Sequence, residues 1–130
     1  MIDHVSVGVS DLGRAVRFYE AAFAPLGFSK LVVRPTDVGF GKSYPEFWIN
    51  LRTDMKPVSS MSGMHICLRA KTAIEVEAFH DAALKAGGVS GGAPGLRPQY
   101  HSTYYAAFII DPDGNRVEAV TFLRDEARAS

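Results

Sequence analysis

The chain repeats itself, and this repeat limits its possible folds more than any other feature. The segment Asp3-His4-Val5 aligns with Met64-His65-Ile66, at an offset of 61 residues. The same offset superposes four further identical pairs: Phe18 on Phe79, Ala21 on Ala82, Ala22 on Ala83 and Gly27 on Gly88. A gapless register that holds over about 25 residues indicates two copies of one supersecondary unit.

Hydrophobic periodicity predicts the same elements in each copy. Val5, Val7 and Val9 alternate with other residues, which is the period of a strand with one buried face. Residues 64–69 alternate in the same sense, so both histidines are expected on the face opposite the aliphatic one. A helix should follow each strand, capped by Ser10-Asp11 and ended by Gly27 in the first copy, and capped by Thr72 and ended by Gly87-Gly88 in the second.

Further strands complete two βαβββ modules of an α+β protein. We expect strands at residues 28–34, 38–41 and 46–52 in the first copy, and near residue 89 and at 104–110 and 116–122 in the second. Asp111-Pro112-Asp113-Gly114-Asn115 has the composition of a tight hairpin. Residues 54–62 are the expected linker, 91–101 an aperiodic Gly/Pro-rich loop, and 124–130 a fraying tail. The 130 residues thus form one domain with modules at 1–54 and 62–123.

Composition excludes several classes of protein. Lys+Arg and Asp+Glu are 14 each, and this balance argues against a nucleic-acid partner, which would require a concentrated positive charge. Cys67 is the only cysteine, so no intramolecular disulfide can form. No apolar run is long enough for a membrane span, and residues 1–5 lack the pattern of a signal peptide. We therefore expect a cytoplasmic protein without a membrane partner.

Three side chains are candidates for a metal site. His4 and His65 occupy equivalent positions of the two copies, on the same sheet face, and Glu118 is a carboxylate in the middle of an apolar strand. Two imidazoles and one carboxylate can hold a divalent cation and leave positions open for substrate. Each residue alone also has a simpler explanation, as a hydrogen-bonded histidine or a glutamate on a solvated sheet face. The repeat favours the metal site.

The same residues carry a resemblance to the vicinal oxygen chelate superfamily, which includes glyoxalase I, extradiol dioxygenases, fosfomycin-resistance thiol transferases and bleomycin-binding proteins. The matching motifs are Ile2-Asp3-His4-Val5, Asp11-Leu12 through Phe18-Tyr19, His65, and the run from Asp111 to Glu118. The resemblance implies a cupped mixed β-sheet with helices outside, as in the glyoxalase/bleomycin resistance/dioxygenase fold. It also implies a metal on the concave floor, held by His4, His65 and Glu118, and a homodimer.

One position departs from the glyoxalase pattern. Asn50 stands where glyoxalase I-like members have a carboxylate that is both a ligand and a proton carrier, and an amide cannot be a general base. Three ligands instead resemble the facial triad of extradiol dioxygenases and of fosfomycin-modifying members. The metal (Fe, Mn, Ni or Zn) and the reaction (lyase, dioxygenase or transferase) stay open.

Several other residues are candidate substrate contacts. Strand parity puts Trp48 on the side of Asn50, and Arg69 on the side of His65. Trp48 could stack on a flat substrate or pack in the core, and Arg69 could bind a substrate anion or neutralise Glu118. Further candidates lie in or after the Gly/Pro-rich loop: Tyr100, His101, Tyr104 and Phe108, of which His101 or Tyr100 could be a general base, although this loop could also simply cap a sheet edge.

Two functions follow as hypotheses. The first is an enzyme whose divalent ion chelates a small substrate through adjacent oxygens at His4, His65 and Glu118. The second is a binding protein that sequesters an antibiotic or another aromatic small molecule without turnover, with aromatic side chains lining its cavity.

Overall fold

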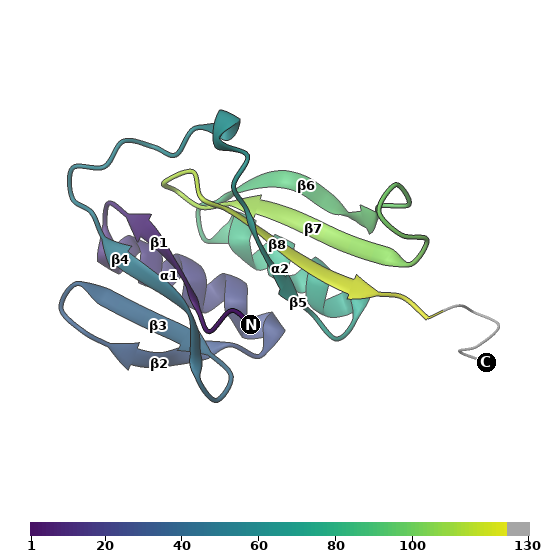
Figure 1. The fold of residues 1–130 in the computed structure, drawn as a ribbon, viewed down its shortest axis with the longest axis horizontal. Coiled ribbons are helices and arrows are strands. Elements are labelled where there is room, and N and C mark those ends of the chain that lie inside the picture. Colours follow the sequence, from purple (N-terminus) through teal and green to yellow (C-terminus); the bar gives the residue numbers. More distant parts are fainter. Residues whose placement is uncertain (125–130) are drawn as a thin grey trace.

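The protein consists of two modules with the same order of elements, as seen in a computed structural model that describes residues 1–124 (Figure 1). The first module contains β1 (Val5–Val9), α1 (Leu12–Phe23), β2 (Ser29–Val33), β3 (Asp37–Gly41) and β4 (Pro45–Leu51). The second contains β5 (Ile66–Arg69), α2 (Ala73–Lys85), β6 (Val89–Leu96), β7 (Tyr104–Ile110) and β8 (Arg116–Phe122). Two single-turn helices, η1 (Ala24–Leu26) and η2 (Ser60–Ser62), lie after α1 and in the linker. Apart from its first residue, the predicted tail lies outside the described part of the chain.

Each module forms its own four-stranded mixed sheet, with orders β1-β4-β3-β2 and β5-β8-β7-β6. β1 runs parallel to β4, and β5 runs parallel to β8, whereas the other neighbours are antiparallel. β1 and β5 are therefore edge strands. The helices lie behind both sheets in Figure 1, so the helix-free faces of the two sheets point the same way. The predicted α+β class, the βαβββ order and the outer helices are confirmed.

Local signals explain where the helices begin and end. The Asp11 side chain accepts a hydrogen bond from the backbone N–H of Arg14, and the Thr72 hydroxyl accepts one from the backbone N–H of Glu75. Both are N-caps that satisfy a backbone donor left free at a helix start. The chain leaves α1 through η1 and reverses at Gly27, whose φ of +80° suits glycine.

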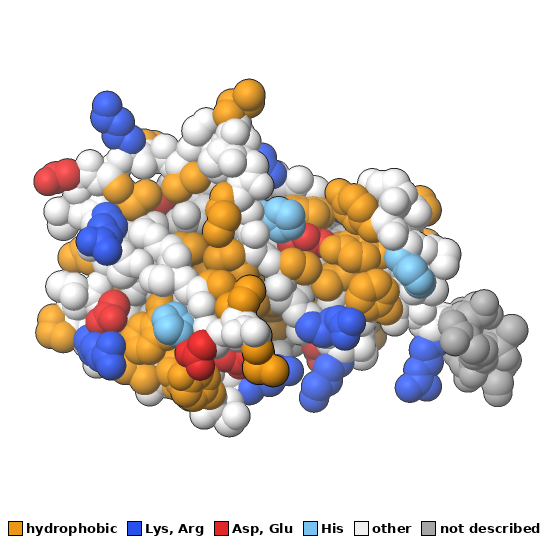
Figure 2. Space-filling view, in the orientation of Figure 1, with side chains coloured by type: hydrophobic (Ala, Val, Ile, Leu, Met, Phe, Trp, Pro, Cys, Tyr) orange, Lys and Arg blue, Asp and Glu red, His pale blue; other side chains and the backbone are white. Residues whose placement is uncertain are grey.

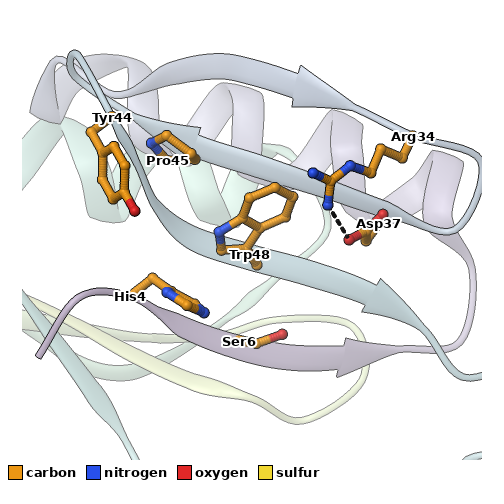
Figure 3. Close-up of a pocket in the computed structure, with 7 residues that line it drawn as sticks. All are labelled: His4, Ser6, Arg34, Asp37, Tyr44, Pro45 and Trp48. Atoms are coloured by element: carbon orange, nitrogen blue, oxygen red, sulfur yellow. Dashed lines mark hydrogen bonds and ion pairs between the residues drawn. The ribbon is translucent and has the colours of Figure 1, made fainter.

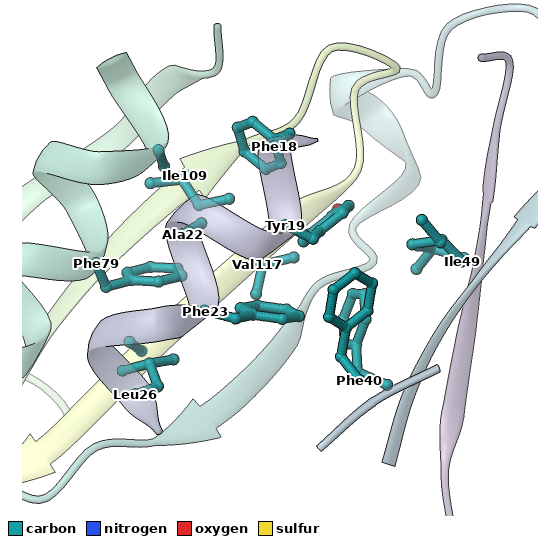
Figure 4. Close-up of a cluster of buried hydrophobic side chains, with 14 of the residues drawn as sticks. Phe18, Tyr19, Ala22, Phe23, Leu26, Phe40, Ile49, Phe79, Ile109 and Val117 are labelled. Carbon is teal, nitrogen blue, oxygen red and sulfur yellow. The ribbon is translucent and has the colours of Figure 1, made fainter. Parts of the chain in front are cut away.

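The core is continuous across both modules. Phe18, Tyr19 and Phe23 on α1 are fully buried, and Tyr19 and Phe23 pack with aromatic side chains from the first sheet (Figure 4). Phe79 on α2 and Ile109 on β7 belong to the same buried cluster, which joins α1 to the second module. Burial of this apolar surface is the main stabilising contribution that the two modules share.

The β7–β8 hairpin also ties the second module to the first by polar contacts. Tyr19 Oη donates to Asp111 Oδ2 at 2.6 Å, and the Ser10 hydroxyl and backbone N–H both donate to the Asp113 carboxylate. Asn115 Nδ2 donates to the carbonyl of Gly8 at 2.9 Å. The predicted hairpin is thus present, and it is in addition a buried connection between the modules, here called the inter-module latch (Asp111–Asn115).

The predicted aperiodic loop at 91–101 is partly wrong, because β6 extends through Leu96. The pairing of β6 with β7 is interrupted at Ser90/Gly92 and Gly92/Gly95. Such irregularities remove the period of two by which a strand is found in sequence. A Cβ added at Gly91 would lie 3.2 Å from Phe108 Cβ, and one added at Gly92 would lie 3.1 Å from the Phe108 ring. Close packing against Phe108 therefore explains why both positions are glycine.

None of the described helices is long and apolar enough to cross a membrane.

Candidate functional site

Two of the three predicted ligands lie side by side in the second module. His65 directly precedes β5, and Glu118 lies in the middle of β8, where it is in register with Cys67 and Phe108. His65 Nε2 is 3.0 Å from Glu118 Oε1. Cys67, two residues after His65, is in register with Glu118, and residues in register project to the same side of a sheet, so His65 and Glu118 share one face.

Glu118 is almost completely buried, with 1% of its surface exposed. Its Oε2 accepts a hydrogen bond from Tyr104 Oη, and no lysine or arginine forms an ion pair with it among residues 1–124. Burial, together with the hydrogen bond to Glu118, raises the pKa of Tyr104, so Tyr104 stays a donor at neutral pH. A buried carboxylate without a lysine or arginine partner in the described chain is a suitable ligand for a metal cation.

Cys67 lies beside this pair but is not an activated thiol. Burial first, and the charge of Glu118 second, raise the pKa of Cys67 to about 12. Thiolate is the reactive form, so Cys67 is inert at neutral pH.

His4 lies in the first module, away from this pair. Its Nδ1 is 2.7 Å from Asp3 Oδ2, and Asp3 also accepts a hydrogen bond from Tyr44 Oη. His4 borders a pocket of about 330 Å³ on the open face of the first sheet (Figure 3). The other residues that line it are Ser6, Arg34, Asp37, Tyr44, Pro45 and Trp48.

Among residues 1–124 of a single chain, no group of three His, Cys, Asp or Glu side chains is close enough to hold a metal ion. The structure therefore joins His65 to Glu118 and does not join His4 to either. The reason is topological, since His4 and His65 precede the edge strands of two separate sheets. A local sequence pattern carries no information about the distance between those edges.

The two histidines do border one common pocket, of about 430 Å³, at the junction of the modules. It is lined by residues 2–5 and 64–68 together with Glu46. Ile2 and Met64 are 80% and 63% exposed there, and hydrophobic side chains run along this junction in Figure 2. The edges of β1 and β5 at this junction are free of strand pairing within the described chain.

Asn50 is occupied by its own module. Its Nδ2 donates to Ser6 Oγ and to the carbonyl of Val7, and its Oδ1 accepts from Arg52 Nε at 2.7 Å. The amide that stands in place of a family carboxylate therefore serves as a link between β1 and β4, and its oxygen is already engaged.

The open face of the second sheet brings three of the other predicted substrate residues together with the His65–Glu118 pair. A pocket of about 450 Å³ is lined by His65, Tyr100, Tyr104, Phe108 and Glu118. His101 is not among them, because its Nδ1 lies 3.0 Å from Thr103 Oγ1 and its ring packs against Phe122.

Several pocket residues escaped the sequence analysis. Phe122 is an open-face residue that strand parity with Glu118 could have identified. Arg34 was expected to end a strand but lies just after β2, and Tyr44 lies in the turn before β4, where no periodic signal exists. Trp48 was predicted, and the Arg34 guanidinium lies 5.0 Å from the centre of its ring.

Comparison with known proteins agrees with this architecture. The model of the Glyoxalase/Bleomycin resistance protein/Dioxygenase superfamily matches residues 1–119, so the chain belongs to this superfamily. No curated protein matches the sequence.

Solved structures share the fold. A glyoxalase/bleomycin resistance protein from Albidiferax ferrireducens T118 is 29% identical, with 91% of this chain and 96% of that chain covered and a TM-score of 0.80. The fosfomycin resistance protein FosX from Mesorhizobium loti is 18% identical, with 100% and 98% covered and a TM-score of 0.68. FosX from Listeria monocytogenes is 14% identical, with 92% and 91% covered and a TM-score of 0.67. The two FosX likenesses show the fold alone.

Proposed function

We propose that this protein is a metal-dependent enzyme that binds a small substrate through adjacent oxygens, and that its metal centre is completed by two copies of the chain. His65 and Glu118 of one copy and His4 of a second copy would be the ligands. The observation that carries the proposal is the contact of 3.0 Å between His65 Nε2 and the buried Glu118 carboxylate on an open sheet face.

The donor set fits a divalent cation. An imidazole nitrogen and a carboxylate oxygen at this distance can direct lone pairs to one point, and such mixed N/O sets suit Fe, Mn, Ni or Zn. Tyr104 holds the second carboxylate oxygen, which orients the first one towards His65. When bound, the ion would act as a Lewis acid on a substrate oxygen.

A second copy can supply the missing ligand. His4 is half exposed, directly before an edge strand, and the junction beside it carries exposed apolar residues such as Ile2 and Met64. In a dimer with two-fold symmetry that buried this junction, the first module of each copy would lie against the second module of the other copy. This contact would occur twice in the dimer. Two identical centres would result, each with one His4.

Metal content tests the proposal. Protein purified without added metal should hold about one divalent ion per chain, and His4→Ala, His65→Ala and Glu118→Gln should each lose most of it. His80→Ala is the matched control, because the His80 ring bonds to Ser90 on the outer side of the second module, and this variant should retain the metal.

Mixing two defective variants tests the shared centre. A dimer of either variant, His4→Ala or Glu118→Gln, lacks one ligand in both of its centres. In a mixed dimer, one centre lacks both of these ligands, and the other centre is intact. After unfolding and refolding together, the mixture should recover about a quarter of the wild-type metal content, because half of its dimers are mixed and hold one intact centre each. Absence of metal from the wild type, or unchanged metal in His4→Ala, would contradict the proposal.

The alternative function is sequestration of an aromatic molecule without turnover. It is favoured by the aromatic side chains that border pockets on both open faces, among them Trp48, Tyr104 and Phe108. Stabilisation of the protein by an aromatic ligand should then survive treatment with a chelator. Complete loss of that stabilisation after metal removal would argue against it.

A further inference from the structure

The open face of the second sheet carries an arginine that stands apart from the others. The Arg69 guanidinium lies 4.8 Å from the centre of the Phe122 ring, and within residues 1–124 it forms no ion pair and no side-chain hydrogen bond. Stacking on a ring holds a guanidinium in place while its N–H donors stay available. Within residues 1–124, Arg69 is therefore a positioned cation whose donors are unused.

Two other arginines also lie over aromatic rings, and both are engaged. Arg34 is paired with Asp37 at 3.3 Å. Arg97 lies near Phe108 and donates to the carbonyls of Gly95 and Ala93. These contacts give both arginines a structural explanation, and no such contact accounts for Arg69 in the described part of the chain.

Arg69 belongs to the same face as the His65–Glu118 pair. Cys67 is in register with Glu118, and Arg69 follows two residues later on the same side of β5. Since a strand rises about 3.3 Å per residue, Arg69 lies roughly 7 Å beyond the level of Glu118. Tyr104 connects the two sites, because its Oη donates to Glu118 and its ring lies 5.4 Å from the Phe122 ring, on which Arg69 stacks.

We propose that Arg69 and Phe122 form an anion subsite, and that the substrate is an aromatic molecule with an acidic group, such as a carboxylate, at the end remote from the His65–Glu118 pair. This proposal names the class of substrate for the function proposed above, and the role of the subsite in catalysis rests on that function. The aromatic part would lie along Tyr104 and Phe122, and the acidic group would accept the Arg69 N–H donors in a charge-assisted, two-point contact.

The subsite can be tested without a metal ligand. The probes are 2-naphthoate and its neutral isostere 2-naphthamide, which lack adjacent oxygens, titrated into the full chain and followed by NMR. 2-Naphthoate should bind about tenfold more tightly than 2-naphthamide, because only it can accept charge-assisted bonds. Arg69→Gln should abolish this preference. Arg17→Gln, which removes an exposed arginine from the outer helix, is the matched control and should keep it.

The outcomes separate this proposal from the function above. A preference for 2-naphthoate that depends on Arg69 supports the subsite, even if the purified protein holds no metal and the proposed function fails. Equal binding of the two probes, binding of neither, or a preference that persists in Arg69→Gln overturns the subsite, whatever the metal content.

Discussion

The inter-module latch should contribute measurable stability, and Tyr19→Phe isolates one of its bonds. Tyr19 is fully buried, and burial together with Asp111 raises the pKa of Tyr19, so its hydroxyl is a permanent donor. Asp111, 4% exposed, also accepts from the side chain of Asn115 and from the backbone N–H groups of Asp113 and Asn115. Phenylalanine preserves the ring and removes only the donor.

The expected loss is about 2 kcal/mol at pH 7, because a hydrogen bond to a buried charged group contributes about 1.5–3 kcal/mol. For a chain of this size that corresponds to a fall in Tm of roughly 6–8 °C. Urea unfolding and thermal unfolding of the two proteins measure it. Tyr105→Phe is the matched control, because Tyr105 donates to the exposed Glu77 at 2.6 Å and its loss should cost no more than about 0.5 kcal/mol.

The pH dependence gives a second check on the same variant. Burial raises the pKa of Asp111 above 3.8, and the bond from Tyr19 opposes that rise. Asp111 therefore binds a proton more tightly in the folded state than in the unfolded state. Its contribution to the free energy of unfolding falls as the pH rises from 3.8 through the higher pKa of the folded state. Without the Tyr19 donor the folded pKa rises further, and the penalty of Tyr19→Phe should shrink in acid. A penalty equal to that of Tyr105→Phe, or one that grows in acid, would refute the reasoning.

Three further predictions concern stability and reactivity. Asp113→Ala removes the acceptor of the Ser10 and Arg14 donors and should cost about 2 kcal/mol in urea unfolding, because the donors it leaves are partly buried. Gly88→Ala should destabilise by about 1–3 kcal/mol, because an added Cβ would lie 2.5 Å from Phe18, whereas Gly13→Ala meets nothing closer than 3.5 Å within α1 and should stabilise by about 0.5 kcal/mol. With its pKa near 12, Cys67 in chelator-treated protein should react with iodoacetamide at pH 7.5 far more slowly than free cysteine, as mass spectrometry would show.

Much of the fold was predictable because its signals are local. The alternation at Val5–Val9 and the caps at Asp11 and Thr72 each depend on a few neighbouring residues, and the structure confirms them. A strand near residue 89 was expected, but the extent of β6 through Leu96 was missed, because its bulges break the period of two that identifies a strand. The latch was foreseen only as a hairpin, since its contact with Tyr19 spans 92 residues and leaves no local trace.

For the site, the sequence determined which donors exist and which face of a sheet each occupies. The duplicated strand places His4 and His65 at equivalent positions, and the parity of β8 places Glu118 opposite the core face. Only the tertiary structure decided which of them meet. Register between β5 and β8 joins His65 to Glu118. The packing of the two modules through a shared core leaves His4 on a separate sheet, because that packing depends on contacts between residues far apart in the chain.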